Sequence, residues 1–298
     1  MTSNRRIIID TDPGKDDAVA ILLALASPEL EVLALVAVAG NVPLGRTAGN
    51  ASRLVRLVGR DTPVYAGCAG PMKRPLVDAA HVHGMTGLAG LELPDGAAIQ
   101  AQHGVDYLID TLRAELPGSI TLCLLGPATN LAVALIKAPD IAGRIAGVVW
   151  MAGARTEGGN TTPAAEYNVY ADPDAAEIVL ASGIPLTLIP LDLTHQIRLT
   201  PERLARLRAI QSPAARAVVA LFEADRDPPL HDPCVIAHLL RPLFSGAQIN
   251  VAVETSSPFT LGMTVADMQG VTGRPANALW LDQADAAGFF ALLEERLA

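Results

Sequence analysis

Short, almost uninterrupted apolar runs alternate along this chain with longer amphipathic stretches, and this alternation limits the folds that it can adopt. The apolar runs have the length of strands: Arg6–Asp10, Val32–Ala39, Thr121–Leu125, Gly147–Met151 and Leu186–Pro190. The stretches between them are typical of helices: Asp17–Ala26, Arg46–Leu57, Asn130–Lys137, Asp174–Ser182 and Pro201–Ala209. Strands that are apolar on both faces are typical of parallel sheets covered by helices on both sides. We therefore predict an α/β fold with a mostly parallel central sheet and helices on both faces.

No feature of the chain divides it into parts. Its 298 residues are compatible with one large domain, and half of them are hydrophobic, which suits a large buried core. We find no linker, internal repeat or low-complexity block, so we expect a single domain over residues 1–298. The chain contains no stretch of about 18 uninterrupted apolar residues, so we predict no membrane span.

Charge and cysteine content narrow the choice of partners and compartment. The chain has 31 Asp and Glu against 22 Lys and Arg, a formal net charge of −9, which argues against nucleic acid or an anionic membrane as a partner. Cys68, Cys123 and Cys234 are far apart and odd in number, which favours free cysteines in a reducing compartment. The N-terminus leaves no room for the apolar region of a signal peptide. We expect a cytoplasmic protein.

Four aspartates follow the first apolar run within eight positions: Asp10, Asp12, Asp16 and Asp17. Crowded carboxylates repel one another and stay ionised only beside a cation or many hydrogen-bond donors. Asp16 and Asp17 could instead cap the following helix, whose dipole favours negative charge there. Capping does not account for Asp10 and Asp12, which precede a Pro-Gly turn. The pattern therefore favours a metal site, and oxygen-only ligands indicate Ca²⁺ or Mg²⁺.

Further polar groups follow other apolar runs, where ligands bind in parallel sheets, or stand at loop and helix boundaries. They are Asn41, His81, His83, Thr129, Asn160, Glu166, Asn168, His231 and Asp232. Locally, Asn41 and Asn160 could be turn residues, and Thr129 and Asp232 could be helix caps. The amide and acid groups between Gly159 and Asn168 suit sugar hydroxyls.

Together these motifs resemble the inosine-uridine-preferring nucleoside hydrolase family over essentially the whole chain. The resemblance rests on the acidic run and on Ala39-Gly40-Asn41, Gly126–Asn130, Glu166-Tyr167-Asn168 and His231-Asp232-Pro233. It implies an α/β fold, Ca²⁺-dependent hydrolysis of the N-glycosidic bond of ribonucleosides, and a homotetramer or homodimer. Pro229–Cys234 and Gly262–Asp267 are similar to the pyrimidine-preferring bacterial branch, which implies uridine and cytidine as substrates.

The resemblance also implies roles for individual residues. The Ca²⁺ ligands would be Asp10, Asp12, Asp17, Asp232 and the Thr129 carbonyl. Asp12 would also be the general base for the attacking water, and His231 is the second catalytic candidate. The ribose diol would contact Asp16, Asn41 and Asn168, and the 5′-hydroxyl would contact Asn160 and Glu166. His83 and His231 would face the base.

One segment departs from the family pattern. Where relatives carry a longer helix and loop with aromatic residues over the base, this chain has Leu221–Leu230 with Phe222 as its one aromatic residue. The shorter segment predicts a more open base side and weaker base binding. It also leaves His231 as the main protein group expected to meet the base.

Three other functions remain open from the residues alone. A haloacid-dehalogenase-type phosphatase also places Asp-x-Asp after an apolar strand, as in Asp10-Thr11-Asp12, but the Pro-Gly-x-Asp-Asp continuation does not fit it. A non-catalytic Ca²⁺- or ribose-binding protein would account for the acids and amides. A less selective inosine-uridine hydrolase is the alternative to a pyrimidine-preferring one.

Overall fold

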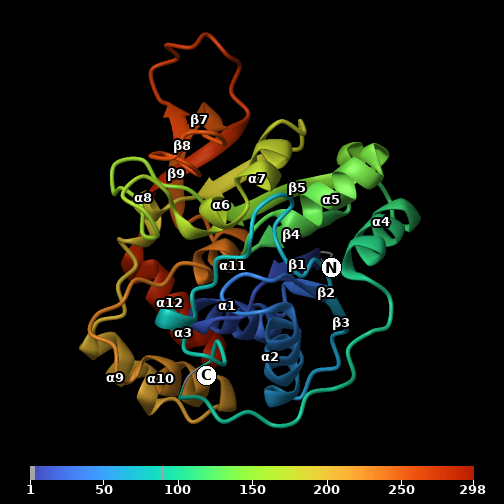
Figure 1. Cartoon of the computed structure of the whole chain (residues 1–298). Helices are drawn as coiled ribbons and strands as arrows, with labels where there is room; N and C mark the ends of the chain where they lie inside the picture. Colours follow the sequence, from blue (N-terminus) through green and yellow to red (C-terminus); the bar gives the residue numbers. More distant parts are fainter. Residues whose placement is uncertain (1–3, 89) are drawn as a thin grey trace.

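Nine strands form one sheet in the computed structural model, which describes residues 4–88 and 90–298 (Figure 1). The strands are β1 (Arg5–Thr11), β2 (Leu30–Ala37), β3 (Val64–Ala66), β4 (Ile120–Leu124), β5 (Ile145–Met151), β6 (Leu186–Ile189), β7 (Phe244–Val253), β8 (Thr264–Asp267) and β9 (Ala278–Ala284). Their order across the sheet is β3-β2-β1-β4-β5-β6-β9-β7-β8. All pairs from β3 to β9 are parallel, whereas β7 is antiparallel to both of its neighbours. The prediction of a mostly parallel sheet is confirmed.

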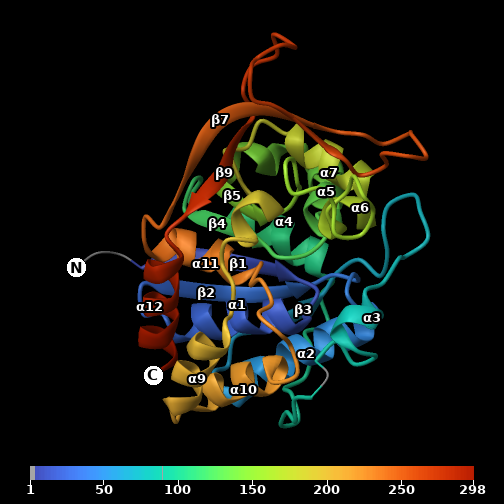
Figure 2. The same ribbon diagram turned by 90° about the vertical axis from the view of Figure 1, so that its left-hand side faces the viewer.

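Helices cover both faces of this sheet (Figure 2). One face carries α1 (Lys15–Ala26), α2 (Leu44–Leu57), α9 (Pro201–Ala209), α10 (Pro213–Phe222), α11 (Pro233–Leu240) and α12 (Ala286–Leu297). The other carries α4 (Gly104–Ala114), α5 (Thr129–Lys137) and α7 (Pro173–Leu180). Successive side chains of a strand point to opposite faces, so Ile7 and Ile9 of β1 pack in the first layer and Ile8 in the second.

Short helices complete the chain: α3 (Ala80–His83), α6 (Tyr167–Ala171), α8 (Leu191–Thr194) and a 3₁₀ helix over Pro139–Arg144. In the described parts of the chain, no helix is both long and apolar enough to cross a bilayer.

The five predicted strands and five predicted helices are all present, as β1, β2, β4, β5, β6 and α1, α2, α5, α7, α9. The sequence patterns did not predict the antiparallel edge formed by β7, β8 and β9. Several side chains of β7 face solvent, including Ser245 to Gln248. β7 lies between β9 and the edge strand β8, and an antiparallel strand so near the edge of a sheet needs no continuous apolar run, because it can be exposed to water.

One buried side chain, that of Asn130, joins the neighbouring carboxyl ends of β1 and β2. Asn130, near the start of α5, donates from Nδ2 to Asp10 Oδ1 at 2.9 Å and to the Ala37 carbonyl at 3.3 Å. Its Oδ1 accepts the Cys68 backbone N–H at 2.7 Å. Asn130 therefore connects the ends of β1 and β2 to the loop after β3 and fixes the position of the Asp10 carboxylate.

The central strand generates a stability prediction. Ile8→Ala removes a fully buried side chain from β1, so we expect the free energy of unfolding to fall by about 2–5 kcal/mol. The matched control is Ile136→Ala on α5, whose side chain is 56% exposed, and which should cost less than about 1 kcal/mol. Urea unfolding of both variants measures the difference. Equal losses at the two positions would contradict this description of the core.

Candidate active site

A pocket of about 440 Å³ opens beside the carboxyl ends of β4 and β5, a volume that suits a small organic ligand. Nine residues singled out from the sequence line it: Asp16, Asn41, His81, His83, Asn160, Glu166, Asn168, His231 and Asp232. The other four, Asp10, Asp12, Asp17 and Thr129, are buried. Asp12 and Asp17 contact Asn41 of the pocket wall directly. The structure therefore brings together residues that are spread over more than 200 positions of the chain.

The Asp12 carboxylate lies between two glycines. A Cβ atom on Gly40 would come within 2.0 Å of Asp12 Oδ2, and one on Gly126 would come within 2.3 Å of Oδ1. The backbone N–H of Asn41 donates to Oδ2 at 2.7 Å. Oδ1 is buried and accepts no hydrogen bond from any described residue. The two glycines thus leave space for a carboxylate that keeps one oxygen available.

Asp10 shows the same half-satisfied arrangement. Asn130 donates to its Oδ1, whereas its buried Oδ2 has no hydrogen-bond partner in residues 4–88 and 90–298. Burial raises the pKa of Asp10 to about 8 against the opposing effect of Asn130. Burial, together with the nearby Asp17 carboxylate, also raises the pKa of Asp12 well above its ordinary value. Ionising these groups is costly unless a positive charge compensates them.

Asp17 is satisfied by the protein itself. Its Oδ1 accepts hydrogen bonds from the Thr11 hydroxyl at 2.6 Å and the Asp12 N–H at 3.2 Å. Its Oδ2 accepts from the Gly14 N–H at 3.0 Å, and so caps the start of α1. The capping interpretation therefore describes the contacts of Asp17, although it does not describe those of Asp10 and Asp12.

Asp232 shows the opposite outcome. It stands at the N-cap position of α11, but within the described residues its side chain makes no capping hydrogen bond. It lines the pocket, and burial together with Asp17 and Asp16 raises its pKa well above the ordinary value. The alternative that Asp232 only caps a helix is wrong, because its carboxylate lies among the other acids.

The donor set fits a hard cation. In the part of the chain that the structure describes, no three Asp, Glu, His or Cys side chains already converge on one point. The fit rests on the two unpartnered buried oxygens of Asp10 and Asp12 and on the raised pKa values of Asp10, Asp12 and Asp232. A hard cation such as Ca²⁺ or Mg²⁺ binds oxygen ligands of this kind and compensates their charge.

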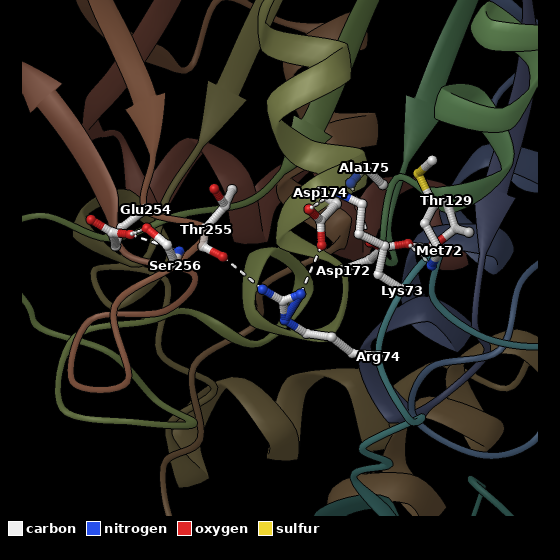
Figure 3. A network of polar contacts seen from close by, with 10 residues as sticks. All are labelled: Met72, Lys73, Arg74, Thr129, Asp172, Asp174, Ala175, Glu254, Thr255 and Ser256. Atoms are coloured by element: carbon white, nitrogen blue, oxygen red, sulfur yellow. Dashed lines mark hydrogen bonds and ion pairs between the residues drawn. The ribbon is translucent and has the colours of Figure 1, made fainter.

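Thr129 is held by a polar network on α5 and α7 (Figure 3). Its hydroxyl donates to Asp172 Oδ2 at 2.7 Å, which also accepts the Met72 N–H at 2.9 Å. The other oxygen of Asp172 accepts the Ala175 N–H and caps α7. The Thr129 side chain is therefore not a cap for α5, and its hydroxyl is held by Asp172.

Three residues of the pocket lining, Asn160, Glu166 and Asn168, offer hydrogen-bonding groups of fixed orientation. Asn168 donates from Nδ2 to the carbonyls of Leu125 at 2.8 Å and Met151 at 3.0 Å, at the ends of β4 and β5. Its Oδ1 is thereby turned away from these carbonyls. Glu166 accepts three backbone N–H groups, and burial raises its pKa to about 7. Asn160 accepts the Tyr167 N–H at 2.9 Å.

Two histidines line another part of the pocket. The Lys15 backbone N–H donates to His83 Nδ1 at 3.1 Å, so the proton of the neutral ring is on Nε2. His231 Nδ1 lies 2.8 Å from the Thr194 hydroxyl. Burial lowers the pKa of His83, and burial with the neighbouring His195 lowers the pKa of His231 to about 3. Both rings are therefore neutral at pH 7.

Phe222, the aromatic residue expected near the base, lines the pocket. The lining also contains residues that the sequence analysis did not predict, among them Lys15, Tyr167, His195 and Asp225. His195 lies 5.8 Å from the His231 ring, and its Nδ1 is 2.7 Å from Glu157 Oε2. It follows the strand at Leu186–Pro190, so its place after a strand end was a usable signal. His195 and Tyr167 line the same pocket as His231, which was expected to be the main group that meets the base.

Comparisons with known proteins agree with this geometry. The family profile for inosine-uridine preferring nucleoside hydrolases matches residues 7–291. An uncharacterised Schizosaccharomyces pombe protein is 47% identical, and the pyrimidine-specific ribonucleoside hydrolase RihA of Shewanella woodyi is 44% identical, each over 98% of both chains. The structure of a purine-preferring ribonucleoside hydrolase from Gardnerella vaginalis matches with a TM-score of 0.90 at 30% identity, over 98% of both chains. The chain therefore belongs to the inosine-uridine preferring nucleoside hydrolase family and is a ribonucleoside hydrolase, an enzyme that cleaves N-glycosidic bonds.

Proposed function

We propose that this enzyme hydrolyses the pyrimidine ribonucleosides uridine and cytidine to ribose and free base, with one bound Ca²⁺. The observation that carries the proposal is the pair of buried, half-satisfied carboxylates of Asp10 and Asp12 beside a pocket of small-ligand size. The pyrimidine preference is supported by 44% identity to a pyrimidine-specific relative, against 30% to a purine-preferring one. That purine-preferring structure supports a less selective hydrolase as the second candidate.

The residues that would hold the ion are Asp10, Asp12, Asp17, Asp232 and the Thr129 carbonyl. When bound, Ca²⁺ supplies a Lewis acid that orients ribose hydroxyls and makes water more acidic. Asp12 would take the proton from the water that attacks C1′ of the ribose. Its Oδ1, which accepts no hydrogen bond from the described residues, is available to take that proton.

The ribose would be held by side chains on both walls of the pocket. Asp16, Asn41 and Asn168 would bind the 2′- and 3′-hydroxyls, and Asn160 and Glu166 would bind the 5′-hydroxyl. As the base departs, positive charge develops on the ribose, and the surrounding carboxylates would stabilise it. Holding the sugar in one orientation also lowers the entropic part of the barrier.

The base would meet His83 and His231. His83 would donate from Nε2, because the Lys15 N–H occupies its Nδ1. His231 is neutral in the folded protein, so we expect it to assist the departing base by a hydrogen bond rather than as a fully charged acid.

We further propose that residues 1–298 act as one domain of a cytoplasmic homotetramer or homodimer. Light scattering would measure the molar mass of the particle and so the number of subunits.

A substrate panel tests the function. Uridine, cytidine, inosine, adenosine and thymidine are incubated with the enzyme, and the released sugar is measured. We expect uridine and cytidine to be hydrolysed fastest. Thymidine lacks the 2′-hydroxyl, so we expect it to be about 10- to 100-fold slower, the effect of one lost charge-assisted contact.

The possible outcomes of this panel are distinct. Faster hydrolysis of inosine than of uridine would refute the pyrimidine preference, and equal rates for thymidine and uridine would refute diol binding. No sugar release from any nucleoside would refute the hydrolase itself and favour a binding protein.

Calcium removal is expected to lower stability as well as activity, because the ion compensates buried carboxylates. Elemental analysis should find about one Ca²⁺ per chain. Adding Ca²⁺ at 100 times its dissociation constant stabilises the folded state by about 2.7 kcal/mol, so Tm should rise by roughly 4 °C over the chelated protein. A chelated protein that has unchanged Tm and full activity would refute the metal site.

Asp12→Asn is expected to lower kcat by about 10²–10⁴-fold, because the amide cannot accept the proton of the attacking water. The amide has nearly the same shape and can still accept the Asn41 N–H, so circular dichroism should show a folded protein. The control is Asp61→Asn, which removes the same charge at an aspartate whose side chain is 93% exposed and should leave kcat unchanged. An Asp12→Asn enzyme with near-normal kcat would exclude Asp12 as the base.

A further inference from the structure

Lys15 and Asp225 form an ion pair in the wall of the pocket although 210 positions separate them. Lys15 Nζ lies 2.8 Å from Asp225 Oδ2, and both residues line the pocket. The two side chains are only 17% and 33% exposed, so water screens this pair less than a surface ion pair. The pair therefore couples the acidic loop to a distant segment within the pocket itself.

Lys15 lies in the part of the pocket wall that contains His83 and His231. Its ammonium is 5.8 Å from the centroid of the Phe222 ring, and its backbone N–H holds His83 Nδ1. Lys15 directly precedes Asp16, which is proposed to bind the ribose diol. One residue thus connects the proposed ribose site to Phe222 and His83.

Helix stability does not account for a lysine at this position. Lys15 is the first residue of α1, where the helix dipole favours negative rather than positive charge. Among the described residues that line the pocket, it is the one Lys or Arg, and the acids there are Asp16, Asp78, Glu166, Asp225 and Asp232. The ion pair with Asp225 gives the lysine a physical reason to be there.

The segment 223–230 that carries Asp225 needs external support. Asp227 has a φ of +50°, a left-handed conformation that residues other than glycine rarely adopt. Arg198 binds the Asp227 side chain at 3.3 Å from the outside. Backbone hydrogen bonds join the Leu199 N–H to the Pro228 carbonyl and the Leu230 N–H to the Ile197 carbonyl, each at 2.8 Å. These contacts hold the end of the segment, whereas Lys15 binds Asp225 near its start and from the pocket side.

We infer that the Lys15–Asp225 ion pair positions the base-side wall, namely Phe222, His83, Pro228 and Pro229, at a fixed distance from the ribose site. The inference rests on the proposed function, because it assigns the base to this wall. Lys15 and Asp225 are positioning residues that act through Phe222 and His83. Nucleoside affinity should therefore depend on the pair, whereas the affinity for ribose alone should not.

A double-mutant cycle tests the inference with Lys15→Met, Asp225→Asn and the double variant. We expect each single variant to raise KM for uridine about tenfold and to change kcat by less than about threefold. The double variant should be no worse than either single variant, because all three remove the same interaction. The inhibition constant of ribose should stay within about twofold of wild type, and Lys15→Arg should restore most of the uridine affinity.

Glu223→Gln is the matched control for Asp225→Asn. It removes a carboxylate from the same segment and breaks an ion pair with Arg208 at 3.1 Å, but these side chains are 56% to 66% exposed and do not line the pocket. We expect its KM for uridine to equal that of wild type. An equal rise in Glu223→Gln would overturn the inference, since any loosening of the segment would then suffice.

Three further results would also overturn it. They are an unchanged KM for uridine in Lys15→Met and Asp225→Asn, a parallel weakening of uridine and ribose, and additive effects in the double variant. A wild-type enzyme that releases no ribose from any nucleoside would instead refute the proposed function, and that result appears before any variant is compared.

Discussion

Several carboxylates are buried at the end of a central strand, and the surrounding structure is built to accommodate them. Asp10 closes β1 in the middle of the sheet, and Asp12 follows it into a space that exists only because Gly40 and Gly126 lack side chains. Asn130 and the Asn41 N–H satisfy one oxygen of each carboxylate. The fold holds these acids rigidly while leaving their second oxygens for a ligand.

The aspartates of the acidic run differ in role: some stabilise the local structure and others face the pocket. Asp17 stabilises the Pro-Gly turn and the first turn of α1, and its oxygens are occupied by protein donors. Asp16 faces the pocket, as does Asp232, which comes from the other end of the chain. Four neighbouring aspartates of one motif therefore have different environments. The differences come from the turn geometry, which points successive carboxylates toward the helix, the sheet or the pocket.

The two walls of the pocket differ in how they are built. The wall with the proposed ribose site consists of groups fixed by the sheet, such as Asn168 on the ends of β4 and β5. The other wall consists of segments held to one another by side-chain contacts, such as Lys15 with Asp225 and His231 with Thr194. Relatives that carry pyrimidine-specific and purine-preferring names share this fold with the chain. A shared sheet, together with a wall whose segments can differ between relatives, is consistent with their different base preferences.

The parallel core and most of the pocket residues could be predicted from sequence patterns. Apolar runs identified β1, β2, β4, β5 and β6, because a strand buried on both faces must be apolar throughout. Polar residues at the ends of those runs identified Asp10, Asp12 and Asn41, because strand ends meet at one edge of the sheet. The contacts by which Asp17 caps α1, Asp232 leaves α11 uncapped and Lys15 pairs with Asp225 emerged from the packing of the chain. Those outcomes depend on which segments meet in space, and local patterns carry no information about a contact across 210 positions.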